Sequence, residues 1–205
     1  MKIVIADKSH IIYSEIICNT IDKAAKVRGT GIAKRKPEYI TEKIKNGNGV
    51  IALDGDNFAG FCYIEQWSHG KFVANSGLIV HPDYRNLGLA KKIKRAIFNH
   101  SRNKFPEAKI FSITTGLAVM KMNSELGYRP VTFSELTTDQ TFWNGCQTCK
   151  NFDVLQRTDQ KMCLCTGMLY DPKSKDNIDT KKIKEKSFNR LKNIKQALFL
   201  KNKKK

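Results

Sequence analysis

The segment from Val80 to Ala90 constrains the fold more than any other part of the chain. An apolar strand end leads through a turn with Pro82 and Arg85 to the start of an amphipathic helix at Gly88. Amides at a helix N-terminus lack intrahelical partners and lie at the positive end of the helix dipole, so they can bind phosphate oxygens. Gly88 and Ala90 let a ligand approach the backbone, and Arg85 adds a positive charge. The sequence therefore predicts a strand, a phosphate-binding loop and a helix in succession.

The sequence around this loop predicts an α/β (α+β) fold with one core. Short turns between apolar runs before the loop predict a three-stranded antiparallel meander. The strand, helix and strand around the loop itself predict a crossover unit. The expected strands are 2–6, 50–53, 58–67, 71–80, 109–114, a strand from Tyr128 and a strand at 163–170, and the expected helices begin after a cap at Ser9, at Pro37, at Gly88 and at Leu117.

The loop resembles the signature of the GNAT acetyltransferase superfamily, V-x-P-x-x-(R/Q)-x-x-G-x-(G/A). Val80, Pro82, Arg85, Gly88 and Ala90 match its specified positions. The resemblance implies the GNAT fold, in which a mixed, mostly antiparallel sheet has a central parallel strand pair and flanking helices. It also implies acetyl-CoA or another acyl-CoA as co-substrate. The alternative is an ordinary strand-to-helix turn that contains a glycine.

The same resemblance assigns the coenzyme contacts. The pantetheine arm would lie along the end of the strand like an added strand, and the pyrophosphate would lie on the loop amides. The residues implied to bind the coenzyme are Ile79, Val80, Arg85, Asn86, Leu87, Gly88, Leu89 and Ala90.

Four longer sequence segments resemble one group within this superfamily. RGTGIAKR, FAGFCYIE, HGKFVANSGLIV and TTGLAVMKMNSELGYRPV are similar to small bacterial acetyltransferases associated with arginine biosynthesis, which implies an acetyl or related acyl group moved to the amine of glutamate or a similar acidic amino acid. Arg28, Lys34 and Arg35 lie in a basic loop where the family builds its acceptor pocket, and Arg binds carboxylates through two hydrogen bonds. The alternative for this loop is a solvated run of charge.

Several polar residues are candidates for catalysis. The acceptor ammonium must lose a proton before its nitrogen can attack the thioester. Glu65 could accept this proton, and Asn75 with Ser76 could hold a water that carries it, although Glu65 could also be a solvated hairpin residue. The family motif A-x-x-x-Y-x-K-x-G-F has a Tyr that protonates the departing thiolate. Asn123 stands at that position in VMKMNSELGY, so the chain departs from the family pattern there, and an exposed helix residue is the alternative for Asn123.

Four cysteines form two close pairs, which we call the cysteine cluster. Cys146 and Cys149 form C-x-x-C in an insertion at 139–162, and Cys163 and Cys165 follow as C-x-C on one face of the expected strand. Four thiolates can enclose Zn²⁺, and an insertion with little core of its own would gain order from such an ion. Reduced buried thiols and an oxidised pair are the alternatives, whereas the remaining two cysteines are expected in the core.

The charge of the chain is concentrated in its last residues. Residues 172–205 contain 13 Lys or Arg and 3 Asp or Glu, in a chain of net charge +18. We expect a GNAT domain at 1–171 and a basic extension at 172–205, in which a helix at 183–200 packs on the domain or on a second subunit of a homodimer. The chain lacks the long apolar run of a signal peptide, so we expect a cytoplasmic protein with no membrane partner and only weak nucleic-acid binding.

Two other functions remain open at this point. The first is acetylation of a protein lysine or a polyamine, which like-charge repulsion from the basic domain disfavours. The second is a catalytically inactive GNAT-like binding protein whose basic tail binds nucleic acid. The departure at Asn123 favours the second function, and the intact phosphate loop disfavours it.

Overall fold

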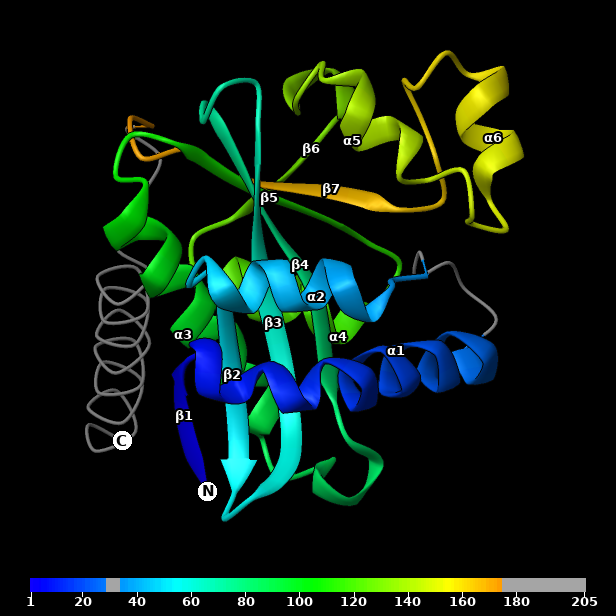
Figure 1. Cartoon of the computed structure of the whole chain (residues 1–205). Helices are drawn as coiled ribbons and strands as arrows, with labels where there is room; N and C mark the ends of the chain where they lie inside the picture. The colour runs from blue at the N-terminus through cyan, green and yellow to red at the C-terminus, as the bar shows by residue number, and fades with distance from the viewer. Residues whose placement is uncertain (29–33, 175–205) are drawn as a thin grey trace, which may run out of the picture. The chain divides into compact units, whose positions relative to one another are not determined.

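A seven-stranded sheet runs through the computed structural model, which describes residues 1–28 and 34–174 (Figure 1). The strand order is β1, β2, β3, β4, β5, β7, β6, and each neighbouring pair is antiparallel except β4 and β5. The predicted mixed sheet with a central parallel pair is therefore confirmed. The strands are β1 (Lys2–Ile5), β2 (Gly49–Asp54), β3 (Asn57–Trp67), β4 (Phe72–Val80), β5 (Lys109–Thr114), β6 (Arg129–Val131) and β7 (Thr166–Tyr170).

Helices pack on both faces of this sheet. Figure 1 shows α1 and α2 across one face of β2, β3 and β4, and α3 packs on the opposite face with α4. A 3-10 segment, η1 (Lys8–Tyr13), precedes α1. The helices are α1 (Ser14–Arg28), α2 (Pro37–Lys45), α3 (Leu89–Lys104), α4 (Leu117–Glu125), α5 (Gln140–Asn144) and α6 (Phe152–Arg157).

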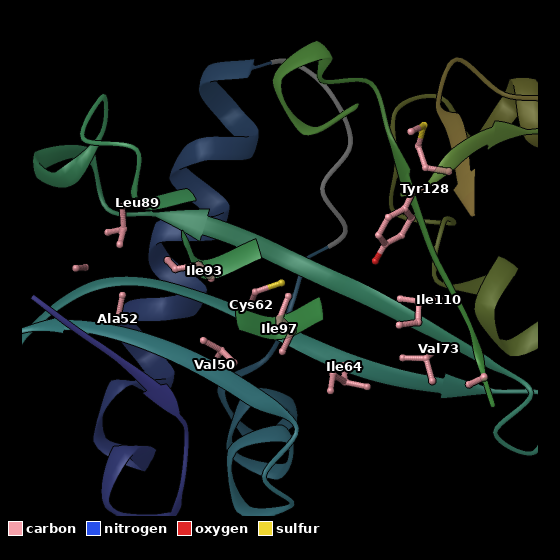
Figure 2. Packing of buried hydrophobic residues seen from close by; sticks show 13 residues of the cluster. Val50, Ala52, Cys62, Ile64, Val73, Leu89, Ile93, Ile97, Ile110 and Tyr128 are labelled. Carbon is pink, nitrogen blue, oxygen red and sulfur yellow. The ribbon is translucent and has the colours of Figure 1, made fainter. Parts of the chain in front are cut away.

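The side chains of β3 are buried on both faces of the sheet, in one cluster with α1 and α2 and in another with α3. Side chains alternate between the faces of a strand, so a strand buried on both faces is apolar at successive positions. Phe61 and Tyr63 pack in the cluster with α1 and α2. Cys62 and Ile64 pack in the cluster with α3, where Figure 2 shows them beside Ile97. The core therefore lies on both sides of β3, and the predicted burial of Cys62 is confirmed.

The parallel pair of β4 and β5 is short. The two strands pair only from Phe72 to Ala74 on β4, opposite 109–111 on β5. Beyond Ala74, β4 continues to Val80, and among the described strands it pairs there with β3 alone. The edge of β4 that faces β5 therefore has backbone amides and carbonyls without a strand partner from Asn75 onward.

A bulge bends β4 within this unpaired stretch. Phe61 pairs with Ile79, but Tyr63 pairs with Ser76, so the register shifts around Gly77. Gly77 has a φ of +64°, and a Cβ built on it would meet Tyr63 Cε1 at 2.2 Å. Only glycine fits both this left-handed backbone and this close approach.

The insertion at 139–162 forms α5 and α6 between β6 and β7. Trp143 and Leu155 are buried in a third cluster with Phe111 of β5 and Leu169 of β7. The large apolar side chains of the insertion therefore share a core with the sheet, in keeping with the expectation that the insertion has little core of its own. The expected strand at 163–170 begins only at Thr166, since the β5 ladder that supports it ends at the pair between Thr114 and Thr166.

The N-terminal cap also differs from prediction. Asp7, and not Ser9, is the N-cap, since its carboxylate accepts a hydrogen bond of 2.9 Å from the Ser9 amide. Asp and Ser are comparable N-cap residues, and here Asp7 comes almost directly after β1. The helix expected at 183–200 lies outside the described residues. Within the described ranges, no helix has both the length and the apolar character needed to cross a membrane.

Candidate active site

The predicted phosphate-binding loop connects the end of β4 at Val80 to the start of α3 at Leu89. A 3-10 turn, η2 (Pro82–Tyr84), follows β4, and Gly88 then forms the N-cap of α3 with a left-handed φ of 71°. In the described part of the chain, no side chain caps α3 at this residue. The first amides of the helix can therefore receive the oxygens of a phosphate group.

Contacts inside the loop maintain its shape. Arg85 Nε donates to the carbonyl of Val80 at 3.4 Å, while the Arg85 side chain stays exposed. Asn86 has a left-handed φ of 63°, which asparagine tolerates better than most residues. Leu89 is buried against the sheet (Figure 2), whereas the burial of each residue shows Asn86–Gly88 to be exposed. A ligand can therefore reach the loop from solvent.

A cavity of about 1040 Å³ opens where β4 and β5 diverge. One wall is β4 from Asn75 to Ile79, and the wall opposite runs from Ser112 on β5 into the start of α4. The basic loop before α2 and the insertion complete the lining. Since β4 leads directly from this cavity into the phosphate-binding loop, a ligand that follows the β4 edge would reach both.

The polar wall of the cavity contains a cation and a carboxylate. Arg35 Nε donates to Tyr63 Oη at 2.7 Å, and its guanidinium lies 5.6 Å from the centroid of the Tyr39 ring. Tyr39 Oη donates a hydrogen bond to Glu65, whose side chain is only 7% exposed. Burial and the charge of Glu65 raise the pKa of Tyr39, so Tyr39 stays protonated as the donor. Burial acts to lower the pKa of Arg35, but Tyr63 and Glu65 raise it overall, so Arg35 stays charged.

Some of the site residues predicted from the sequence line the cavity, and one lies outside the described side chains. Lys34, Arg35, Glu65 and Ser76 all line the cavity, and Glu65 is buried, so the alternative of a solvated hairpin residue is wrong for it. The side chain of Arg28 lies outside the described residues. Sequence reasoning missed Tyr39 and Tyr63. The only signal for Tyr39 was its place one residue before the apolar Ile40 on a short helix, which does not identify a ligand.

Asn75 belongs to a buried polar network that sequence reasoning also missed. Its Nδ2 donates to Ser101 Oγ at 2.8 Å, and its Oδ1 accepts from Tyr128 Oη at 2.9 Å and from Lys94 Nζ at 3.4 Å. Lys94 is 2% exposed, and both Lys94 and Asn75 line the cavity. The signal for Lys94 was its helical spacing, because Ala90, Ile97 and Ser101 share its face of α3.

Asn123 is buried on α4, with 0% exposure. Its Nδ2 donates to Ser112 Oγ at 2.7 Å, and its Oδ1 has no hydrogen-bond partner among the described residues. The alternative of an exposed helix residue is therefore wrong for Asn123. Ser112 lines the cavity and Asn123 does not, so the family's tyrosine position here connects α4 to β5 rather than facing the cavity.

All four members of the cysteine cluster line the end of the cavity formed by the insertion. Burial, followed by the neighbouring thiols, raises the pKa of Cys146 to about 11 and that of Cys165 to about 12. All six cysteines of the chain lie in the described part and are free thiols. Within residues 1–28 and 34–174, no group of three or more His, Cys, Asp or Glu side chains is arranged to hold a metal ion. A zinc ion at the cysteine cluster stays a prediction.

The family follows from a sequence comparison that agrees with this geometry. The sequence model described as the acetyltransferase (GNAT) family matches residues 20–122, which is half of the chain. The chain belongs to the GNAT acetyltransferase family. The match includes Glu65, the bulged β4, the phosphate-binding loop and the first part of α4 of this GNAT protein. No curated protein sequence matches the chain.

Solved structures share the fold at low sequence identity. N-acetylglutamate synthase from Neisseria gonorrhoeae, solved with coenzyme A and N-acetyl-glutamate, has a TM-score of 0.60 and 15% identity over 84% of this chain. This chain spans only 35% of that protein. A GNAT acetyltransferase from Staphylococcus aureus Mu50 has a TM-score of 0.60 and 16% identity over 84% of this chain and 99% of its own. A Mycobacterium tuberculosis protein solved with CoA has a TM-score of 0.58 and 14% identity over 83% of this chain and 99% of its own.

Proposed function

We propose that this GNAT protein transfers an acetyl or related acyl group from acyl-CoA to the amine of an amino acid with a carboxylate side chain, such as glutamate. The observation that carries the proposal is the presence of Arg35 and Glu65 on one wall of the cavity beside the open edge of β4. A cation and a buried carboxylate suit an acceptor that has both a carboxylate and an ammonium group. The Neisseria gonorrhoeae neighbour, solved with N-acetyl-glutamate, supports glutamate as the first acceptor to test.

The coenzyme would be held by backbone groups along β4 and the loop. The unpaired amides and carbonyls of β4 from Asn75 to Val80 can pair with the amide groups of the pantetheine arm. The uncapped start of α3 and the exposed Arg85 can bind the pyrophosphate. In this arrangement the thioester lies in the cavity, near the point where β4 and β5 separate.

The acceptor would then be activated beside the thioester. Arg35 binds the acceptor carboxylate, and Glu65 accepts a proton from the acceptor ammonium, directly or through a water near Ser76. The deprotonated nitrogen can then attack the thioester carbonyl. The hydrogen bond from Tyr39 orients the Glu65 carboxylate for this role.

We also propose that the cysteine cluster binds a structural zinc ion. Thiols must lose their protons to bind zinc, and burial opposes this by raising the pKa of Cys146 and Cys165, whereas a divalent cation reverses that effect. Zinc binding would connect the insertion to the start of β7 and fix the insertion's wall of the cavity.

A screen of acceptors tests the proposed function. Release of CoA thiol is measured with acetyl-CoA and succinyl-CoA against acidic, apolar and basic amino acids, polyamines and lysine peptides. Apolar amino acids are included because Phe142 and Phe152 line the same cavity. We expect acidic amino acids to react fastest. A preference for polyamines or lysine peptides, or the absence of any transfer, would contradict the proposal.

Two variants test the role of Arg35. Arg35→Gln removes the charge at the cavity wall, and we expect the acceptor KM to rise at least tenfold with little change in the acetyl-CoA KM. Arg95→Gln is the matched control, because Arg95 is exposed on α3 and does not line the cavity. Equal effects of the two substitutions would show that the acceptor carboxylate binds elsewhere.

A further inference from the structure

We infer that Lys94 is a catalytic residue of the acyl transfer, with its ammonium group as the proton donor to the departing CoA thiolate. This inference rests on the proposed function. It concerns the step after nucleophilic attack, for which the family's tyrosine position supplies no group here, because Asn123 is buried against Ser112 and does not line the cavity.

The position of Lys94 is the first support. The residue lies on α3, but its side chain is enclosed between the helix and the sheet. Its Nζ is 3.4 Å from Asn75 Oδ1, and Asn75 is the first residue of β4 beyond the last β4–β5 pair, Ala74 with Phe111. The ammonium therefore lies at the closed end of the opening between the two strands. A thioester that enters along the β4 edge would bring its sulfur toward this point.

The lack of a counter-ion is the second support. Within residues 1–28 and 34–174, no ion pair involves Lys94. The ammonium contacts a neutral amide oxygen of Asn75 and lies 4.9 Å from the centroid of the Tyr128 ring. An ammonium has three donors, and these two contacts leave capacity for another acceptor. A buried cation without an anion is costly, so an anion that enters the cavity is stabilised there.

Cys62 and Tyr128, which face Lys94, stay neutral near neutral pH. Cys62 faces it from β3, and burial raises the pKa of that thiol to about 11. Tyr128 faces it from the segment before β6, and burial raises the pKa of its phenol as well. The carboxylate of Glu65, also on β3, raises the pKa of Cys62 further. Burial lowers the pKa of Lys94 itself to about 8, close to that of an ordinary thiol, about 8.5. An acid with a pKa near that of its acceptor transfers a proton readily.

Lys94 gives up its proton as the bond between the acyl carbon and the CoA sulfur breaks. After attack by the amine, the C–S bond breaks and its electron pair moves to sulfur. Lys94 Nζ gives one proton to that sulfur, which leaves CoA as a neutral thiol and Lys94 as a neutral amine. The acceptor nitrogen has meanwhile lost two protons, one before attack through Glu65 and one afterwards. One of these returns to Lys94 through solvent and the other is released, so each turnover releases one proton.

Kinetics of Lys94→Met test the inference, with Lys92→Met as the matched control because Lys92 is exposed on the same helix. We expect kcat of Lys94→Met to fall by about 10²- to 10⁴-fold while the acetyl-CoA KM changes less than about threefold. In the wild type, kcat should decline above pH 8 as Lys94 loses its proton, and this decline should be absent from the residual activity of Lys94→Met. Equal kcat values for the two variants, or the same alkaline decline in both, would overturn the inference and leave the proposed function intact.

A measurement on the wild-type protein keeps the inference testable if Lys94→Met fails to fold. The lysine side chains are labelled with ¹³C and titrated by NMR with and without CoA, and Lys94→Arg identifies the resonance. We expect one lysine with a pKa of about 8, shifted upward when CoA thiolate binds beside it. Binding of CoA without any change at this resonance would overturn the inference. If no acceptor is acylated, both the inference and the proposed function are overturned.

Discussion

Replacement of Gly88 by aspartate tests the phosphate-binding loop most directly. Gly88 has a φ of +71°, and a Cβ added there would meet no atom within 4 Å. The substitution therefore does not disturb packing, and it strains the backbone by about 1 kcal/mol, since Asp tolerates the left-handed region better than most residues. It also places a carboxylate at the amides that would hold the pyrophosphate.

The expected loss of affinity follows from Coulomb's law. Two unit charges about 4 Å apart repel by about 1 kcal/mol in bulk water and about 4 kcal/mol at the effective dielectric of a protein surface. The loop is exposed, so the repulsion lies between these limits. We therefore expect Kd for CoA to rise by about 5- to 1000-fold, and the effect to shrink in high salt because the charges are screened.

Gly55→Asp is a close control for this experiment. Gly55, in the turn between β2 and β3, has a φ of +58° and also has no atom within 4 Å of an added Cβ. Both substitutions should lower Tm by a similar few degrees. Isothermal titration calorimetry with CoA then separates them. Equal CoA affinity of Gly88→Asp and Gly55→Asp would refute the assignment of this loop to the pyrophosphate.

Glu65, the cysteine cluster and Lys94 line the cavity, and each can be tested by substitution. Glu65→Gln should lower kcat by about 10²-fold or more with little change in the acetyl-CoA KM, whereas an unchanged kcat would show that another group accepts the proton. Elemental analysis of protein purified without an affinity tag should find close to one zinc per chain, lost on replacing two cysteines of the cysteine cluster by serine; metal-free protein with four reactive thiols would contradict this. Because the pKa of Lys94 is lowered to about 8 in the folded state and is about 10.4 when unfolded, the unfolded chain holds the extra proton between these values. The wild type should therefore gain up to about 3 kcal/mol of stability relative to Lys94→Met between pH 8 and pH 10, measured by urea unfolding, and parallel pH curves would contradict the burial of a charged Lys94.

The elements near the phosphate-binding loop could be predicted from sequence because their determinants are local. A strand end, a proline turn and an uncapped helix start are each specified by a few neighbouring residues, so Val80 to Ala90 folds as predicted. The start of β7 could not be predicted in the same way. Its position at Thr166 depends on where β5 ends, which is far away in sequence.

The missed site residues share a physical reason. Lys94 stands in a run of lysines and arginines that is typical of a solvated helix face, and this composition outweighed its helical spacing from Ile97 and Ser101, which places it on the buried face. Asn123 is likewise buried by packing between α4 and β5, where Ser112 accepts its hydrogen bond. Tyr39 and Tyr63 acquire a role only when α2 and β3 bring them to Arg35 and Glu65. Periodicity can place a polar residue on a buried face, but its hydrogen-bond partners depend on tertiary contacts that periodicity does not contain.

The brief pairing of β4 with β5 joins two parts of one sheet, and each part lines a different side of the cavity. Strands β1 to β4 lead into the loop proposed to hold the coenzyme, whereas β5, β7 and β6 support the insertion that lines the rest of the cavity. Only three residue pairs join these two parts along the sheet. A change in the insertion would therefore alter the cavity without passing through the strands that lead into the loop. Exchanging the insertion should accordingly change the shape of one side of the cavity while Arg35 and Glu65, which lie outside it, stay in place.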